Sequence, residues 1–393
     1  MRLKILQIFN RYFQYGGEEG SVYRIGDALQ EIHDVEYFLG SSKDLFEGGL
    51  FKKALVPINS IWNANVIRRL RKYQAMGHFD IWQIHNVFVG LSPAVYKEAF
   101  RMGIPIVHYL QNYRFGCIKG SFIREGKSCH LCTMHKYGPG IYHGCWRDSS
   151  LMSAWMALLL EYSYSLGLMD KVAAWVVLSN IQKTRYVEMG FPKDRISVIP
   201  HFYSASKNSP LPTTQRNVLF IGRLSPEKGV DRLLHAWKLV GRKDAKLFIV
   251  GEGPEREKLE EICTDNALSN VVFTGFLNKE KQYEIWEKVL FTVVPSIWEE
   301  PFGMVVLESW NYARAVLATN LGAFPETIGD SIGGQLFDAD DLNDLATKIS
   351  HWLDNPAEAI SAGQAGRKRL ETNFSKEVWL SNASDIYQKV YNK

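Results

Sequence analysis

Two carboxylates in the second half of the chain have a spacing that suits a ligand with hydroxyl groups at both ends. Glu300 and Glu308 are eight residues apart in FTVVPSIWEEPFGMVVLESWNYARA, residues 291–315, which is expected to join a strand to a helix. Eight helical residues span about 12 Å. Pro301 suits a first helical turn, and Gly303 would let the backbone approach a ligand closely. A helix start at this position would direct free N–H groups at an anion such as a diphosphate.

Two cations on a second loop suit the same diphosphate. Arg223 and Lys228 lie in GRLSPEKGVDRLLHAW, residues 222–237, where a glycine-bounded loop enters an expected helix. An arginine binds phosphate as a planar fork, and a lysine binds it as a mobile point charge. A solvated loop and two surface carboxylates near a helix start are the alternative interpretation of these four residues.

Parallel sheets must position these loops, because short apolar runs alternate with helix-period segments in both halves of the chain. Ten strands are expected: residues 3–9, 35–40, 80–85, 105–110, 174–179, 217–222, 246–251, 271–275, 291–295 and 315–319. They predict two Rossmann-like, doubly wound α/β domains that face each other across a cleft, with ligands beyond the carboxyl ends of the strands.

Composition agrees with two folded domains in 393 residues, since 46% of the residues are hydrophobic and only 22% are charged. We expect an N-terminal domain over 1–205, a C-terminal domain over 206–373 and a final helix over 374–393. Residues 1–205 carry 24 Lys and Arg against 16 Asp and Glu, whereas residues 206–393 carry 22 against 26. The positive N-terminal half favours an anionic partner, and an unevenly charged solvated surface is the alternative.

The order of five motifs resembles the retaining glycosyltransferases of the GT-B fold, family four (glycosyl transferases group 1). The motifs are GRLSPEKG, GEGPE, TGFL, the Glu300–Glu308 pair and ATNLGAFPE, residues 318–326. The resemblance implies transfer of a hexose-type sugar from a UDP, GDP or ADP sugar to a hydroxyl acceptor, without a catalytic divalent metal. It also implies that the final helix crosses back to the N-terminal domain.

The resemblance assigns roles to individual residues of this sequence. The expected donor-binding residues are Gly16, Gly17, Arg223, Lys228, Gly251, Leu277, Glu300, Phe302, Gly303, Met304, Val305 and Glu308. The expected catalytic residues are Glu300, Arg223, Lys228, His108 and His85. The expected acceptor-side residues are His85, Asn86, Gln111 and Asn112, with Gln111 standing where related enzymes commonly carry a histidine. Either that histidine's role is absent or His108 or His85 fills part of it.

Four cysteines have the spacing of a structural zinc site. Cys117, Cys129, Cys132 and Cys145 form an insert in the N-terminal half, with one tight C-x2-C pair. The insert marks a subgroup of the family that this chain resembles. It ends in CWRDSS, residues 145–150, to which the sequence assigns no role. An iron–sulfur site or ordinary reduced thiols are the alternatives.

The expected location is cytoplasmic, with peripheral contact to the cytoplasmic face of an anionic inner membrane. MRLKILQIFNRYF is expected to be a first strand and not a signal peptide. Residues 51–74 mix aliphatic and basic side chains, which suits either a membrane surface or a solvated helix. Residues 150–169 are expected to form a core helix. No nucleic-acid partner is expected, and a lipid-linked saccharide in bacterial surface polysaccharide or glycolipid synthesis is the expected acceptor. The rival functions are a nucleotide-sugar epimerase of the same fold and a catalytically silent sugar-nucleotide-binding protein.

Overall fold

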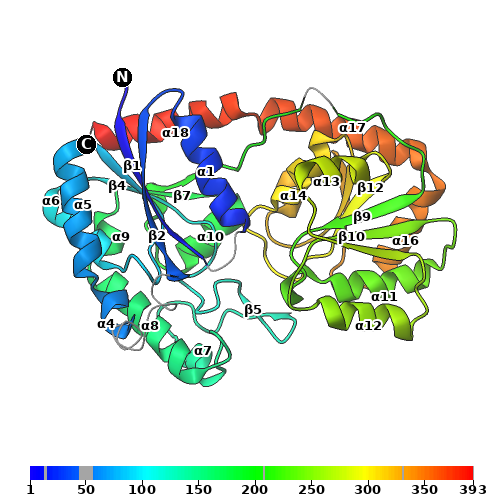
Figure 1. Cartoon of the computed structure of the whole chain (residues 1–393), viewed down its shortest axis with the longest axis horizontal. Coiled ribbons are helices and arrows are strands. Elements are labelled where there is room, and N and C mark those ends of the chain that lie inside the picture. The colour runs from blue at the N-terminus through cyan, green and yellow to red at the C-terminus, as the bar shows by residue number, and fades with distance from the viewer. Residues whose placement is uncertain (13–15, 44–55, 207–208, 330–331, 393) are drawn as a thin grey trace. The chain divides into compact units, whose positions relative to one another are not determined.

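The computed structural model describes residues 1–12, 16–43, 56–206, 209–329 and 332–392. The chain forms two compact units (Figure 1). Unit 1 comprises residues 1–121, 130–200 and 379–393, and unit 2 comprises residues 122–129 and 201–378. No helix among the described residues is long and apolar enough to cross a membrane.

Unit 1 is built on a six-stranded parallel sheet in the order β2-β1-β3-β4-β7-β8. Its strands are β1 (Lys4–Arg11), β2 (Asp34–Ser41), β3 (Ile81–Asn86), β4 (Ile106–Tyr109), β7 (Ala174–Val177) and β8 (Ile196–Val198). Its helices are α1 (Gly17–Leu29), α4 (Val56–Ile61), α5 (Ala64–Gly77), α6 (Ala94–Met102), α7 (Gly138–Tyr142), α8 (Ser150–Ser165), α9 (Leu168–Lys171), α10 (Asn180–Glu188) and most of α18 (Lys376–Tyr391), with a 3-10 turn, η1 (Lys193–Arg195). Every β1 residue between the two end residues is buried, as expected of a strand covered on both faces.

Unit 2 repeats this architecture with the strand order β11-β10-β9-β12-β13-β14. Its strands are β9 (Asn217–Ile221), β10 (Lys246–Val250), β11 (Val271–Gly275), β12 (Phe291–Val294), β13 (Ala315–Thr319) and β14 (Gly334–Phe337). Its helices are α11 (Val230–Val240), α12 (Arg256–Asp265), α13 (Lys279–Trp286), α14 (Met304–Asn311), α15 (Phe324–Ile328), α16 (Leu342–Asp354) and α17 (Pro356–Asn373), with a 3-10 turn, η2 (Pro226–Lys228). A short hairpin of β5 (Ile123–Arg124) and β6 (Lys127–Ser128) also groups with unit 2.

Alternate residues of β9 enter two different apolar clusters. Val218 and Phe220 pack in the larger cluster with α11 residues such as Trp237, whereas Leu219 packs in a smaller cluster with Trp286 of α13. Figure 1 shows α11 and α12 on one side of β9 and β10, and α13 and α14 on the other. Successive side chains of a strand point to opposite faces, so helices pack on both faces of this sheet. This arrangement confirms the predicted doubly wound fold.

All ten predicted strands are present, within a few residues of the expected bounds. The sequence analysis missed β8, β14 and the β5–β6 hairpin, which are only two to four residues long and have no extended apolar run. Residues 150–169 do not form a fully buried helix. Helix α8 is exposed at Leu151 and Leu158 while its opposite side, including Leu159 and Leu160, is buried.

Helix α18 is anchored in unit 1 by one buried hydroxyl group. Tyr387 is fully buried, and its hydroxyl donates a hydrogen bond to the side-chain oxygen of Gln83. The amide nitrogen of Gln83 in turn donates to Gln7 at 2.8 Å. Burial raises the pKa of Tyr387, so the hydroxyl keeps its proton and its role as donor.

Replacing Tyr387 with Phe is therefore expected to lower the free energy of unfolding by about 1–2 kcal/mol, because the Gln83 oxygen stays buried without a donor. Tyr391→Phe is the matched control, since Tyr391 lies on the same helix and is 41% exposed. Urea-induced unfolding of both variants measures the difference. Equal stability of the two variants would contradict this anchoring role.

Candidate functional site

The site predicted from the sequence falls at the switch point of the unit 2 sheet. Strand β9 pairs with β10 on one side and with β12 on the other. In open parallel sheets, ligands bind where the connections leave a strand in opposite directions. The loop after β9 carries Arg223 and Lys228, and the loop after β12 carries Glu300.

Lys228 and Glu300 meet across these two loops. Lys228 Nζ lies 2.5 Å from Glu300 Oε1, and the Ser296 hydroxyl donates to the same oxygen at 3.0 Å. The Glu300 side chain is 8% exposed, whereas the Lys228 side chain is 27% exposed. One of the three ammonium N–H groups serves Glu300, so the others remain to bind oxygen atoms of a ligand.

Two glycines allow the loops to approach this closely. Gly229 has a φ of 64°, and a Cβ there would lie 2.1 Å from the carbonyl oxygen of Pro295. Gly322, in the loop after β13, has a φ of 57°, and a Cβ there would lie 2.4 Å from the backbone nitrogen of Glu300. Both positions therefore exclude side chains by conformation and by space.

The helix after β12 begins later than predicted. Helix α14 starts at Met304 with Gly303 at its N-cap, so the expectation that Pro301 forms the first helical turn is wrong. The preceding loop is held by other contacts, because the backbone N–H of Ala323 donates to the Glu300 carbonyl at 2.9 Å. Glu300 therefore lies in a loop, and a helical spacing of about 12 Å does not describe its relation to Glu308, which lies within α14.

The remaining predicted donor residues surround the same loops. Phe302 is buried, and its ring packs edge-on to the His201 ring at 5.4 Å. Gly251 follows β10 with a φ of 141°, and a Cβ there would lie 1.9 Å from the Gly222 carbonyl oxygen. Leu277 packs against the smaller apolar cluster. The half-buried residues at the start of and within α14 are Met304, Val305 and Glu308.

Arg223 stands apart from the Lys228–Glu300 pair. It is exposed, and it makes no ion pair with any described residue. Its position directly after β9 leaves its guanidinium group available to a ligand at the carboxyl end of the sheet.

The switch point of unit 1 lies at β1, between β2 and β3. Gly16 is the N-cap of α1 and Gly17 is its first residue. A Cβ at either position would meet no described atom within 4 Å, so neither glycine is required by packing within the described chain. The open space agrees with the predicted approach of a ligand to this helix start.

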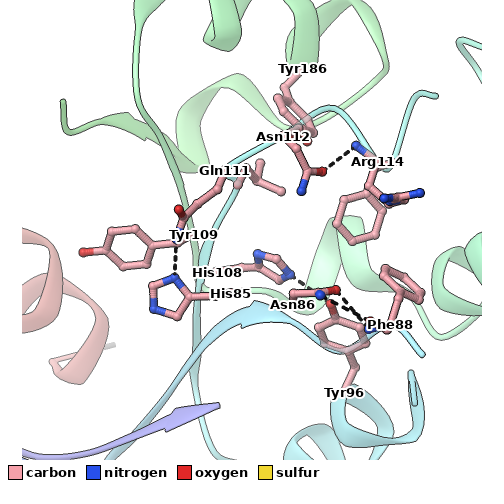
Figure 2. A pocket seen from close by; sticks show the side chains of 12 residues that line it. His85, Asn86, Phe88, Tyr96, His108, Tyr109, Gln111, Asn112, Arg114 and Tyr186 are labelled. Carbon is pink, nitrogen blue, oxygen red and sulfur yellow. Dashed lines mark hydrogen bonds between the residues drawn. The ribbon is translucent and has the colours of Figure 1, made fainter. Parts of the chain in front are cut away.

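The four predicted acceptor-side residues come together in unit 1. His85, Asn86, Gln111 and Asn112 line one small pocket at the carboxyl ends of β3 and β4. Figure 2 shows these side chains with Arg114 beside them. His85 is 4% exposed, and its ring stacks on Tyr109 with centroids 5.0 Å apart.

Two glutamines hold His85 in place. Its Nδ1 lies 2.9 Å from the amide nitrogen of Gln111, and its Nε2 lies 2.8 Å from that of Gln83. Gln111, which stands where the family resemblance led us to expect a histidine, therefore contacts His85.

His108 is more deeply enclosed. Burial lowers its pKa to about 3, so the ring is neutral at neutral pH. Its Nε2 lies 2.9 Å from the Tyr96 hydroxyl, and its ring lies 5.0 Å from that of Trp175. These contacts favour a packing role for His108 over the expected catalytic one.

Sequence analysis missed a polar cluster beside this pocket. Glu18 Oε2 accepts hydrogen bonds from the Tyr12 hydroxyl and from the Asn112 amide, both at 3.0 Å. Glu18 Oε1 is buried and has no hydrogen-bond partner among the described residues. Burial raises the pKa of Glu18 to about 7, and Tyr12, Asn112 and Arg114 oppose that rise. The only sequence signal was a pair of glutamates directly after the Gly16–Gly17 pair.

The predicted zinc site is not supported. Within the described part of the chain, no group of three or more His, Cys, Asp or Glu side chains is arranged to hold a metal ion. The backbone N–H groups of Cys117, Cys129 and Cys145 donate to Tyr113, Phe122 and Gly140 respectively, so each belongs to a different local turn. Spacing along the chain does not set the directions of the side chains, which these turns determine. All five cysteines lie in described segments, and none forms a disulfide.

Comparison with known proteins connects both parts of the chain to glycosyltransferase families. Residues 204–369 match the family described as Glycosyl transferases group 1, and residues 15–207 match the one described as Glycosyltransferase Family 4. An uncharacterized glycosyltransferase of Methanocaldococcus jannaschii is 31% identical over 381 residues, which cover 96% of each chain. The chain belongs to the group 1 glycosyltransferases. It is therefore a glycosyltransferase, an enzyme that transfers glycosyl groups.

Further proteins similar to this glycosyltransferase include a bacterial sugar transferase and two solved structures. The O-antigen chain mannosyltransferase C of Escherichia coli is 29% identical over 171 residues, which cover 43% of this chain and 45% of the relative. Among solved structures, the sucrose-phosphate synthase of Thermosynechococcus elongatus has a TM-score of 0.73 at 20% identity over the whole of both chains. HepE of Anabaena, solved in complex with UDP, has a TM-score of 0.70 at 15% identity over 98% of this chain and all of its own. These structures share the GT-B fold.

The close approach at Gly322 can be tested by substitution. In this glycosyltransferase, Gly322→Ala should displace the Glu300 loop and lower both stability and affinity for nucleotide sugars. Gly241→Ala is the control, because Gly241 also has a positive φ but its Cβ would meet nothing nearer than 3.8 Å. The control should cost only about 1–2 kcal/mol, the strain of a left-handed residue. Thermal unfolding and ligand titration measure both effects, and equal behaviour of the two variants would refute the steric account.

Proposed function

We propose that the protein is a retaining hexosyltransferase that uses a nucleoside diphosphate sugar. The observation that carries this proposal is the contact between Lys228 and Glu300 at the switch point of unit 2. It places a cation that suits a diphosphate directly beside a carboxylate that suits sugar hydroxyl groups. HepE of Anabaena, which shares the fold, was solved with UDP-glucose, and this supports a nucleotide sugar as the donor.

The donor residues divide by the part of the donor that they would bind. Lys228, Arg223 and the N–H groups at the start of α14 bind the diphosphate. Glu300 binds the transferred sugar, and Glu308 binds the ribose. Neighbouring contacts to donor groups would come from six further residues of unit 2: Gly251, Leu277, Phe302, Gly303, Met304 and Val305.

The proposed reaction replaces one bond at the anomeric carbon and keeps its configuration. The bond from that carbon to the diphosphate oxygen breaks, and the acceptor oxygen bonds to the same face. The leaving phosphate oxygen takes the proton of the acceptor hydroxyl. Lys228 and Arg223 stabilise the negative charge that develops on the leaving group. Stabilisation of this kind by fixed charges is usually the largest single contribution to the rate of an enzyme. The two side chains would take the place of a divalent ion.

Unit 1 supplies the acceptor side in this proposal. His85, Asn86, Gln111 and Asn112 line its pocket, where they would orient the acceptor hydroxyl. Named relatives act in surface polysaccharide synthesis, including the Escherichia coli mannosyltransferase and a lipopolysaccharide core glycosyltransferase of Rhizobium meliloti. They support an acceptor in bacterial surface polysaccharide or glycolipid synthesis.

A cytoplasmic location with contact to an anionic membrane remains part of the proposal, but α5 contributes little to it. Val66, Ile67 and Leu70 of α5 are buried, and Arg71 binds Glu98 at 2.9 Å. The apolar side of this helix therefore packs within the protein. Residues 51–55 of the same basic stretch lie outside the described residues.

The first prediction of this proposal concerns the central pair. Lys228→Ala and Glu300→Gln should each reduce kcat by about 10²–10³-fold, as removal of a transition-state contact does. Lys238→Ala is the matched control, because Lys238 lies in the last turn of α11 and contacts Asn266 instead. Initial rates of transfer from a panel of nucleotide sugars measure the effect. Normal turnover in either central variant would exclude the donor site proposed here.

Stereochemistry tests the retaining mechanism. Proton NMR of the fresh product should show the anomeric configuration of the donor sugar, because the acceptor attacks the face that the diphosphate leaves. An inverted product would contradict the mechanism. Interconversion of the donor without an acceptor would instead indicate an epimerase, and binding without turnover would indicate a catalytically silent protein.

Chelation tests the role assigned to the two cations. Transfer should continue at its original rate in EDTA, because Lys228 and Arg223 already neutralise the leaving diphosphate. The measurement is the initial rate with and without chelator. Loss of activity that Mg²⁺ or Mn²⁺ restores would contradict metal-independent transfer.

A further inference from the structure

A second pocket in unit 1 is lined by two arginines and, among the described residues, by no acidic side chain. Its volume is about 120 Å³, and Arg114 and Arg147 both contribute to its lining. No carboxylate from the described residues belongs to the lining. The remaining polar lining comes from Tyr12, Ser42 and Asn86.

Arg114 is placed at the border of this pocket and the acceptor-side pocket of Figure 2. Its Nη1 donates to the Ile118 carbonyl at 2.6 Å, and its backbone N–H donates to Asn112 Oδ1 at 2.9 Å. The side chain is half-buried, and it makes no ion pair with a described residue. A guanidinium group has five N–H donors, so one internal bond leaves it able to bind an anion.

Glu18 lies near Arg114 but does not neutralise it fully. Glu18 binds Tyr12 and Asn112, and no ion pair joins it to Arg114. Because burial raises the pKa of Glu18 to about 7, a large share of this carboxyl group is uncharged at neutral pH. Glu18 therefore neutralises Arg114 only in part.

The CWRDSS segment, which the zinc hypothesis left without a role, supplies Trp146 and Arg147 to the lining. The Trp146 backbone N–H donates to the Ser153 hydroxyl at 2.9 Å, and the Trp146 ring lies 5.5 Å from that of Trp155. Helix α8 thus fixes Trp146, and the Arg147 guanidinium lies 5.3 Å from the Trp146 ring centroid. This contact holds the Arg147 guanidinium beside the pocket, where it can meet an anionic group of a ligand.

Ser42 adds a neutral donor to the same pocket. Its buried hydroxyl accepts a hydrogen bond from the Asn10 side chain at 2.9 Å. Asn10 also donates to the Phe88 carbonyl at 2.7 Å, which fixes the pocket wall at the ends of β1 and β3. The proton of the Ser42 hydroxyl is then available to an oxygen of the ligand.

We propose that this pocket binds a phosphate group of the acceptor, between Arg114 and Arg147. The proposal rests on the proposed function, since it names the class of acceptor that the transferase uses. The pocket adjoins the acceptor-side residues through Arg114, so a sugar anchored by its phosphate would present a hydroxyl group near His85 and Gln111. The phosphate can belong to a sugar phosphate or to a lipid-linked saccharide, because both offer the same oxygen atoms.

The test compares phosphorylated and neutral ligands on the full chain saturated with a nucleoside diphosphate. The probes are glucose 6-phosphate against glucose, and a polyprenyl-diphosphate sugar in detergent micelles against the corresponding neutral glycolipid, each measured by calorimetry. The phosphorylated member of at least one pair should bind at least tenfold more tightly. The pair that shows this preference identifies the source of the phosphate.

Arg147→Ala should abolish that preference, and Arg114→Lys should weaken it, because a lysine keeps the charge but loses the fork. Lys136→Ala, which removes an exposed cation of the same insert outside the pocket, should leave it unchanged. Affinity for the nucleoside diphosphate should be the same in all variants. Equal binding of phosphorylated and neutral ligands, or a full preference in Arg147→Ala, would overturn the proposal. Failure of the wild type to bind nucleotide would instead count against the donor site.

Discussion

The close approach of three loops at the carboxyl end of the unit 2 sheet is the constraint on which the proposed donor site depends. Gly229 and Gly322 permit that approach, since a Cβ at either position would overlap backbone atoms of the loop after β12. The result is a short contact between Lys228 and a nearly buried Glu300. Because backbone and not flexible side chains sets this geometry, the charges are held in position before a ligand arrives, as electrostatic stabilisation of a leaving group requires.

Unit 1 uses the same architecture with different chemistry. Its strand ends carry amides, tyrosines and histidines held in a hydrogen-bonded network, of which the two glutamines around His85 are the clearest part. Its charges are left less balanced, because Glu18 has a raised pKa and Arg114 has no carboxylate partner among the described residues. A fixed ion pair in unit 2 and an arginine without a described carboxylate partner in unit 1 suit two ligands of different kinds, a donor and an anionic acceptor.

Local patterns explain which features were predictable. Strand β9 was expected because its apolar run is bounded by polar and glycine residues, and the loops with Lys228 and Glu300 were expected because their motifs are continuous in sequence. The start of α14 was misplaced because contacts of the Glu300 backbone with a distant loop, through Ala323, override the preference of Pro301. The cysteine spacing misled for a related reason, since the turns around each cysteine determine where it points. Arg114 and Glu18 could not be found, because their environment comes from segments nearly a hundred residues apart.

The central claim is that the loops after β9 and β12 bind the diphosphate of the donor. A crystal structure of the protein with a bound nucleoside diphosphate tests it most directly. The account predicts phosphate oxygens within hydrogen-bonding distance of Lys228 Nζ and the Arg223 guanidinium, with the ribose hydroxyl groups on Glu308. A nucleotide bound elsewhere, with the Lys228–Glu300 contact closed and no phosphate beside it, would contradict the account.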